Sequence, residues 1–315
     1  MTQPSAKIIL DSINQQGNRI TTMEVVMHRF VLAEFNTHRV FSRNSASSRA
    51  IPAKKMIRKA QIDPAEPVIW PHERQGMQGG LPFNQDGIEK CQDIWDEARE
   101  DAIDSAQRLV KIELHKSLTN RLIEPFLWHT VIVTSTEWDN FFWQRCHPDA
   151  QPEMKAAADA MQLAYYKDPE PKELAHGMWH LPYINKQDED DAYVLSDARY
   201  HVALDILQKV SVARCARVSY LTHDGVRSLE KDLELYDKLR TSGHWSPFEH
   251  VATPITDLRD PNTGNFTGWK QYRKLFNGEN GTAFIPNHPE LLCKKVMTVE
   301  VVEEGQADEV QEPNV

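Results

Sequence analysis

The sequence lacks the features that define several broad classes of protein. It contains 4 cysteines among 315 residues, and none of them forms a Cys-x-x-Cys pair, so no disulfide framework is expected. No apolar run reaches the length of a membrane span. The N-terminus lacks a charged start followed by a long apolar stretch, so no signal peptide is expected. These absences predict a reduced, cytoplasmic protein with no membrane partner.

Positive charge is also scarce. The chain has 46 acidic residues against 36 lysines and arginines, and its formal net charge is -10. A broad basic face for nucleic acid is therefore not expected. A local basic cluster carries more information here, because it stands against the field of the whole molecule.

Hydrophobic periodicity predicts an α+β fold, with long helices packed on a mixed or antiparallel sheet. We expect strands within residues 6–35 and helices over 53–62, 87–114, 151–166 and 228–243, the last of them stopped by Gly243. Residues 63–87 and 166–196 are expected to be loops. Thr134 and Glu137 have capping-box spacing and predict a helix start. The following aromatic residues are expected to be buried: Trp128, Trp138, Phe141, Phe142 and Trp143.

The stretch THRVFSRNSASSR, residues 37–49, is the strongest local basic cluster. It combines Arg39, Arg43 and Arg49 with a row of hydroxyl side chains. A guanidinium binds phosphate through a planar fork of donors, and serine hydroxyls add further hydrogen bonds. Arg39, Ser47 and Arg49 together suit a dianion. A solvated loop with unrelated arginines explains the same residues about equally well, and no glycine-rich phosphate loop is present.

Three other segments contain polar side chains beside apolar ones. They are STEWDNFFWQRCHPDAQPEM with Asn140 and Arg145, VARCARVSY with Arg214 and Arg217, and SGHWSPFEHV with His244 and His250. Each segment alone is a weak signal, because a histidine or arginine is more often structural than catalytic.

Together the four segments resemble the flavin-dependent thymidylate synthases, over roughly half of the chain. The family pattern Arg-His-Arg-x-x-Ser-x-Asn-Glu-x-Ser-x-Arg aligns with residues 37–49, where His38, Arg39, Ser42, Asn44, Ser47 and Arg49 match it. Two further motifs match Asn140, Phe141, Arg145, Ala150, Gln151, Glu153 and Met154, and Arg217 to Tyr220. The family's Gly-His-x-Thr/Ser-Pro-Phe-Glu-His matches residues 243–250. The resemblance implies one catalytic domain over residues 1–300, with a signature half (1–165), a flavin and folate half (195–300) and an acidic disordered tail (301–315).

The chain departs from the family at three positions and in motif order. Thr37 replaces an arginine, Ser45 a glutamate and Glu34 a glutamine. The two motifs that precede the signature in the family follow it here, so the sequence looks circularly permuted. Permutation predicts that TTMEVVMHR and FEHVATPI lie near each other, within one chain or across a subunit contact. The segment GNFTGWKQYRK faintly echoes the family's lead into the signature and offers Gln271 or Arg273 in place of Glu34 and Thr37.

The resemblance implies reductive methylation of dUMP to dTMP. FAD, 5,10-methylenetetrahydrofolate and NADPH would carry the chemistry, while the protein orients and polarises. The implied catalytic residues are Ser47, Arg145 and His244. The implied substrate-binding residues are Glu34, Ser45, Ser47, Arg49, Arg121 and Arg145. The implied cofactor-binding residues are Arg39, Thr134, Asn140, Ser219, His244, Ser246 and Glu249. No metal is implied, and family members are homotetramers with shared sites.

Structural roles compete with several of these assignments. Arg121 and Arg145 suit surface salt bridges, which are worth little, but both adjoin aromatic runs expected to be buried. His244 suits a helix C-terminal histidine. His176 and His180 have metal-ligand spacing without an evident third ligand, so a surface pair is favoured.

Three rival functions remain open. Cys146 with His147 and Gln151 mimics the Cys-His-x-x-x-Gln of cysteine-dependent thymidylate synthases, and Arg145 would lower the thiol pKa. Another pyrimidine deoxynucleotide, such as deoxycytidylate, or a hydroxymethyl product is a second possibility, motivated by Glu34, Thr37 and Ser45. A degenerate nucleotide- or RNA-binding module without catalysis is the third.

Overall fold

The structure is a computed structural model that describes residues 2–167, 169–218, 228–257 and 259–279. The chain divides into one compact unit, Met1–Phe276, and a second unit, Asn277–Val315, of which only residues 277–279 are described. The predicted tail over 301–315 lies outside the described residues. All elements below belong to the first unit.

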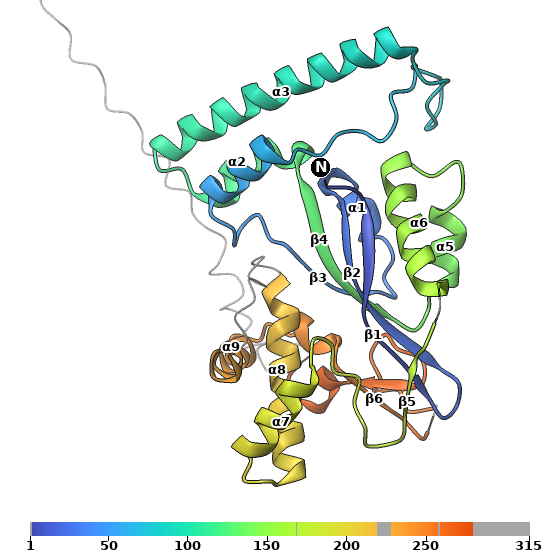
Figure 1. Cartoon of the computed structure of the whole chain (residues 1–315), viewed down its shortest axis with the longest axis vertical. Coiled ribbons are helices and arrows are strands. Elements are labelled where there is room, and N and C mark those ends of the chain that lie inside the picture. Colours follow the sequence, from blue (N-terminus) through green and yellow to red (C-terminus); the bar gives the residue numbers. More distant parts are fainter. Residues whose placement is uncertain (1, 168, 219–227, 258, 280–315) are drawn as a thin grey trace, which may run out of the picture. The chain divides into compact units, whose positions relative to one another are not determined.

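A five-stranded mixed sheet lies at the centre of this unit (Figure 1). Its strand order is β3-β4-β2-β1-β5, and neighbours are antiparallel except for the parallel pair β1 and β5. The strands are β1 (Ser5–Asn14), β2 (Arg19–His28), β3 (Ser42–Ser45), β4 (Trp128–Ser135) and β5 (Lys172–Leu174). The α+β class and the mixed sheet confirm the prediction from the sequence.

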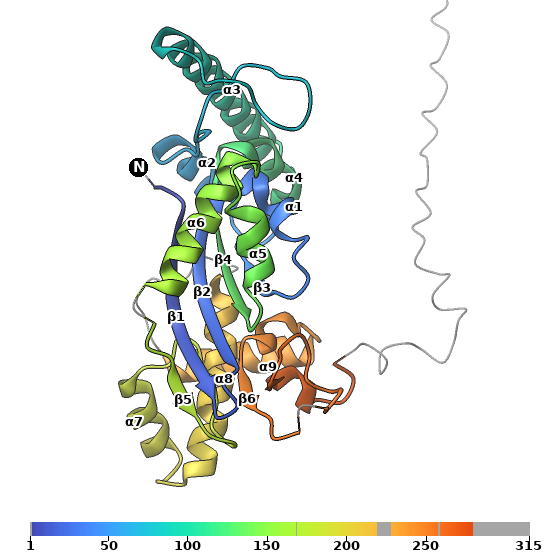
Figure 2. The ribbon, with the colours of Figure 1, turned by 90° about the vertical axis from the view of Figure 1, so that its right-hand side faces the viewer.

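The two faces of the sheet follow the twofold alternation of strand side chains. Met23 and Val25 on β2 belong to the main apolar cluster, which α5 (Asp139–Arg145) and α6 (Pro152–Tyr166) complete. The figures show both helices beside β1 and β2 (Figures 1 and 2). Between these residues, Glu24 faces the other way and accepts a hydrogen bond of 2.8 Å from the Tyr183 hydroxyl. The opposite face is therefore available to the C-terminal segments.

The remaining helices form two further groups around the sheet. One group contains α2 (Ala53–Ile62), α3 (Gln85–Lys111), α4 (Lys116–Thr119) and the 3-10 helix η2 (Asn120–Phe126). The other contains α7 (Lys186–Leu195), α8 (Tyr200–Arg217), α9 (Leu229–Thr241) and the 3-10 helix η4 (Ser246–Glu249). Shorter elements are η1 (Arg29–Val31), α1 (Leu32–Phe35), β6 (Ala252–Pro254), β7 (Trp269–Gln271) and η5 (Tyr272–Leu275). Cys215 and Val218, at the end of α8, pack against Ile132 of β4.

Most predicted helices are confirmed, and three local predictions are wrong. Thr134 does not start a helix, because it lies in β4, and α5 begins at Asp139 without a side-chain cap. Trp143 is 77% exposed, since the helix turns it away from the face that buries Phe141 and Phe142. The predicted loop 166–196 contains β5 and α7, and α7 starts with a capping box between Asn185 and Asp188.

The segments that the permuted order predicts to be neighbours do lie near each other within one chain. Thr22, in TTMEVVMHR, shares a hydrogen bond of 2.6 Å with Thr134, whose hydroxyl lies 2.8 Å from Nδ1 of His250 in FEHVATPI. Ile20 and Ala252 also share one buried cluster. This neighbourhood is confirmed, while the permutation itself stays a prediction.

Candidate functional site

One cavity brings together three predicted site residues from distant parts of the chain. It has a volume of about 390 Å³, within the range of small-molecule sites. Ser47 and Arg49 come from the turn after β3, and His244 follows α9. The rest of the lining is Ala50, His115, Lys116, Ala216 and Leu239. The signature stretch in the N-terminal half and the motif at 243–250 thus meet in one place.

Local backbone geometry sets the position of His244. Gly243 has φ of 68°, a left-handed conformation that favours glycine and ends α9. The backbone N–H of His244 then donates to the carbonyl of Leu239 at 2.9 Å. This turn brings the histidine to the cavity, where it is exposed. Its role as a helix C-terminal residue and its place in the cavity wall are therefore compatible.

The cavity is electropositive. Arg49 and Lys116 line it together with His115 and His244, and none of the described lining residues is acidic. A wall of this kind attracts phosphate, because guanidinium and ammonium groups donate charge-assisted hydrogen bonds to its oxygens. His115 and Lys116 were not predicted as site residues. No spacing rule links them to Arg49, since Lys116 lies 66 residues from the Ala50 carbonyl that it contacts.

A second cluster joins Arg145 to the start of the signature. Its guanidinium pairs with Glu34, and its Nε donates to Nε2 of His38 at 2.9 Å. Burial, then Arg145 and Arg43, lower the pKa of His38 to about 4, so the imidazole is neutral at pH 7. Thr37 lies 3.4 Å away as a further acceptor. Two residues implied to bind substrate, Glu34 and Arg145, thus form an ion pair with each other.

The third cluster places η4 against the signature strand β3. Glu249 pairs with Arg273 and also lies near Arg43. Burial lowers the pKa of Arg43, and this carboxylate opposes part of the shift. Gln271 donates to the Ser42 hydroxyl at 2.8 Å. The segment with Gln271 and Arg273 therefore does reach the signature. Ser246 and Ser45 are partly exposed on these two elements.

A buried chain of hydroxyls and imidazoles connects the sheet to His250. His180 lies 2.9 Å from the Ser12 hydroxyl and 2.8 Å from that of Thr22, and Thr134 continues the chain to His250. Burial lowers the pKa values of both histidines to about 3. The expectation that His180 belongs to a surface pair is wrong, since it is fully buried. Within the described residues, no group of three potential metal ligands is found.

These clusters do not include Arg39, Asn140 or Arg121. Arg39 and Asn140 are exposed, and Asn140 accepts a hydrogen bond of 3.2 Å from Gln144. The expected burial of Arg121 is wrong: its side chain is 52% exposed and pairs with Glu124 at 2.9 Å, the surface alternative. Thr134 is fully buried. Ser219 lies outside the described residues.

Arg214, which precedes the motif at residues 217–220 in the sequence, has a structural role. Its side chain donates to Asp188 at 2.6 and 2.8 Å and to Asp232 at 2.9 Å. Arg217 donates to the other oxygen of Asp232 at 2.8 Å. The four side chains tie α7, α8 and α9 together behind the electropositive cavity.

Cys146 is poorly suited to be a nucleophile. Burial and a hydrogen bond with Asp159 raise the pKa of its thiol to about 11. Only the thiolate is strongly nucleophilic, and it would be scarce at pH 7. The expectation that Arg145 lowers this pKa is wrong, since its guanidinium is directed to Glu34 and His38.

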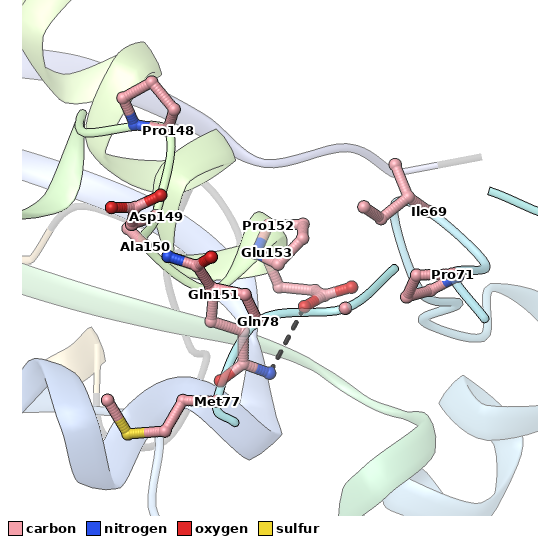
Figure 3. A pocket seen from close by; sticks show the side chains of 11 residues that line it. Ile69, Pro71, Met77, Gln78, Pro148, Asp149, Ala150, Gln151, Pro152 and Glu153 are labelled. Atoms are coloured by element: carbon pink, nitrogen blue, oxygen red, sulfur yellow. Dashed lines mark hydrogen bonds between the residues drawn. The ribbon is translucent and has the colours of Figure 1, made fainter. Parts of the chain in front are cut away.

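A second cavity of about 430 Å³ contains the motif around Gln151 (Figure 3). Glu153 is 5% exposed there and accepts a hydrogen bond of 2.9 Å from the backbone N–H of Val68. Gln151 donates to its other oxygen at 3.3 Å. The carboxylate thus ties α6 to residues 63–84, which form the facing wall with Ile69, Pro71, Met77, Gln78 and Gly79.

Comparisons with solved structures and with protein families both give matches, whereas no curated protein matches the chain. Among solved structures, the UMP/dUMP methylase PolB from Streptomyces cacaoi, bound with 5-Br UMP, is similar with a TM-score of 0.42 and 12% sequence identity. The similarity covers 53% of this chain and 90% of that chain.

A protein-family comparison matches the N-terminal half. The matching family is described as thymidylate synthase complementing protein, and the match covers residues 19–168. This segment contains the signature stretch, Arg121, Arg145 and Glu153, while the motif at 243–250 lies beyond it. The resemblance is thereby confirmed over residues 19–168, which match the thymidylate synthase complementing protein family.

Proposed function

We propose that the protein catalyses the reductive methylation of dUMP to dTMP, with FAD, 5,10-methylenetetrahydrofolate and NADPH. The family match supports the reaction class. The single observation that carries the proposal is the electropositive cavity, which joins Ser47 and Arg49 of the signature to His244 of the separate C-terminal motif. An active site that uses both motifs requires them to meet in the folded chain, although they lie far apart in the sequence.

The residues present fit a nucleotide phosphate and a flavin phosphate. Arg49 and Ser47 supply a guanidinium and a hydroxyl to the dUMP phosphate. Arg39 is exposed and forms no ion pair within the described part of the chain, which leaves its guanidinium available to FAD. When bound, reduced FAD supplies the hydride that completes the methyl group, and NADPH restores the reduced flavin.

The side chains of this chain bind, orient and polarise. Arg145 is held in a fixed orientation by Glu34 and His38, which prepares it to face a pyrimidine carbonyl without reorganisation. His244 lines the cavity and is exposed, so it would be available to contact the flavin and folate. Glu249 is held by Arg273 against the signature strand, in line with a role beside the flavin.

The shared-site arrangement of a homotetramer is part of the proposal. Exposed apolar side chains lie on α3, α4 and η2 and directly after α3: Ile94, Ile112, Leu118 and Leu122 are 67%, 73%, 58% and 42% exposed. A second subunit would cover such residues and complete a cofactor site.

The first experiment is a visible absorption spectrum of the purified protein after incubation with FAD and dUMP and removal of free ligand. We expect retained flavin bands that dUMP perturbs. Product mass is then measured with dUMP, dCMP and UMP as substrates, NADPH and methylenetetrahydrofolate. Arg49→Gln should abolish turnover, while Arg108→Gln, which alters an exposed ion pair on α3, should not.

The outcomes separate the rivals. A protein that never retains FAD would refute the flavin reaction and favour a binding module. A product other than dTMP as the main species would favour the variant pyrimidine methylase or hydroxymethylase, for which Glu34, Thr37 and Ser45 are the motivation. Binding of FAD without product from any substrate would favour a degenerate nucleotide-binding module without catalysis.

A further inference from the structure

The helix α4 and the start of η2 hold the turn that presents Arg49. Lys116 Nζ donates to the carbonyl of Ala50 at 2.8 Å. Asn120 Nδ2 donates to the carbonyls of Ser48 and Ile51 at 2.7 and 3.0 Å. Three carbonyls of the 47–51 turn are thus bound by two side chains from one short segment.

The turn is also closed by its own backbone. The N–H groups of Ala50 and Ile51 donate to the carbonyl of Ser47 at 3.0 and 3.1 Å, and that of Arg49 donates to the Ser47 hydroxyl at 3.3 Å. Asn120 is fully buried, so its hydrogen bonds are protected from water. Ser47 and Arg49 therefore face a ligand from a pre-organised turn.

The charges on this segment are not all alike. Glu124 pairs with Arg29 at 3.1 Å and with Arg121 at 2.9 Å, so these two guanidiniums share one carboxylate. Within the described residues, no carboxylate pairs with Lys116 or with Arg49. Both uncompensated cations line the same electropositive cavity.

The Lys116 ammonium has more donors than its structural contact uses. It carries three N–H groups and accepts nothing, and the Ala50 carbonyl uses one of them. A charge-assisted bond to an anion is available from the others. Lys116 is half-buried and Arg49 is exposed, so solvent reaches both cations and an anion can replace that solvent when it binds.

We infer that Lys116 is a phosphate-binding residue of this cavity, which selects a phosphate monoester over the uncharged nucleoside. The same side chain positions the 47–51 turn through the Ala50 carbonyl. The identity of the ligand as dUMP rests on the proposed function, while the phosphate class follows from the cavity itself.

The test compares the wild-type protein with Lys116→Met, Lys116→Arg and the control Lys90→Met, which alters an exposed lysine on α3. Binding of dUMP and of 2′-deoxyuridine is measured by calorimetry, and binding of inorganic phosphate by ³¹P line broadening. We expect Lys116→Met to weaken dUMP binding by roughly 10-fold or more and deoxyuridine binding by less than about threefold. Lys116→Arg should stay within about threefold of wild type for dUMP, and Lys90→Met should match wild type.

Two results with Lys116→Met would overturn the inference. Wild-type dUMP affinity in Lys116→Met would remove the phosphate role. An equal loss of dUMP and deoxyuridine would reduce Lys116 to a structural clamp. If wild type binds phosphate through Lys116 but not dUMP, the anion site stands and the proposed function fails. If wild type binds neither phosphate nor dUMP, both ideas are refuted.

Discussion

The buried Arg214 network offers the sharpest test of how the cavity is built. Arg214, Asp188 and Asp232 are 4%, 3% and 2% exposed. Arg214 donates two hydrogen bonds to Asp188, one to Asp232 and one, at 2.9 Å, to the carbonyl of Tyr183. Arg214→Met keeps much of the apolar bulk but removes the charge and every one of these donors.

The cost of this change falls mainly on Asp188. Asp232 retains Arg217 at 2.8 Å, whereas Asp188 loses its bidentate guanidinium in a buried position. Breaking a buried ion pair by removing one partner typically costs 3–5 kcal/mol, because it leaves an uncompensated buried charge. We expect the free energy of unfolding to fall by about 3–5 kcal/mol.

Urea denaturation followed by circular dichroism measures this free energy. Arg108→Met is the matched control, because its pair with Asp104 is 69% and 65% exposed and should be worth less than about 1 kcal/mol. The double variant Arg214→Met with Asp188→Asn should recover part of the loss, since it removes the buried carboxylate charge that Arg214 balances. A loss below about 1 kcal/mol for Arg214→Met, or no recovery in the double variant, would refute the reasoning.

Three further predictions concern pH, the thiol and the turn before the cavity. Burial lowers the pKa of His38 to about 4 and those of His180 and His250 to about 3, so only the unfolded chain takes up these protons as the pH falls below about 6.5. The free energy of unfolding is therefore highest above pH 6.5 and falls toward pH 4, by about 2 kcal/mol per histidine at pH 5. Urea denaturation at a series of pH values measures this change, and a flat profile would contradict it. Cys146→Ala should retain most dUMP methylation, because the thiol pKa is raised to about 11, and loss of product in a mass assay would revive the cysteine mechanism. Gly243→Ala should cost about 1 kcal/mol in urea denaturation, because φ is 68° there, and an unchanged midpoint would show that the turn tolerates a side chain.

Local patterns in the sequence determined the elements whose core-facing residues are periodic. The strands within residues 6–35 and the helices α3, α6 and α9 were predicted correctly, because each pattern follows from the geometry of a single element. The capping box at Asn185 is equally local, but it lies in a polar segment whose composition favours a loop. The signature residues were also identifiable, since the family match covers them.

Tertiary structure decided what local signals left open. Thr134 has the chemistry of a helix cap, yet pairing of β4 with β2 and β3 places it in the sheet, where it bonds to Thr22 and His250. Arg121 and Arg145 have similar neighbours in the sequence, but the fold leaves Arg121 exposed beside Glu124 and holds Arg145 in a half-buried pair with Glu34.

The sequence by itself thus determined the α+β class, the main helices and the chemistry of the signature stretch. Only the tertiary structure brought Lys116 to the 47–51 turn and His244 to the same cavity. The physical reason is that a cavity is made by contacts between elements far apart in the chain, and no periodicity within one element encodes which of them will meet.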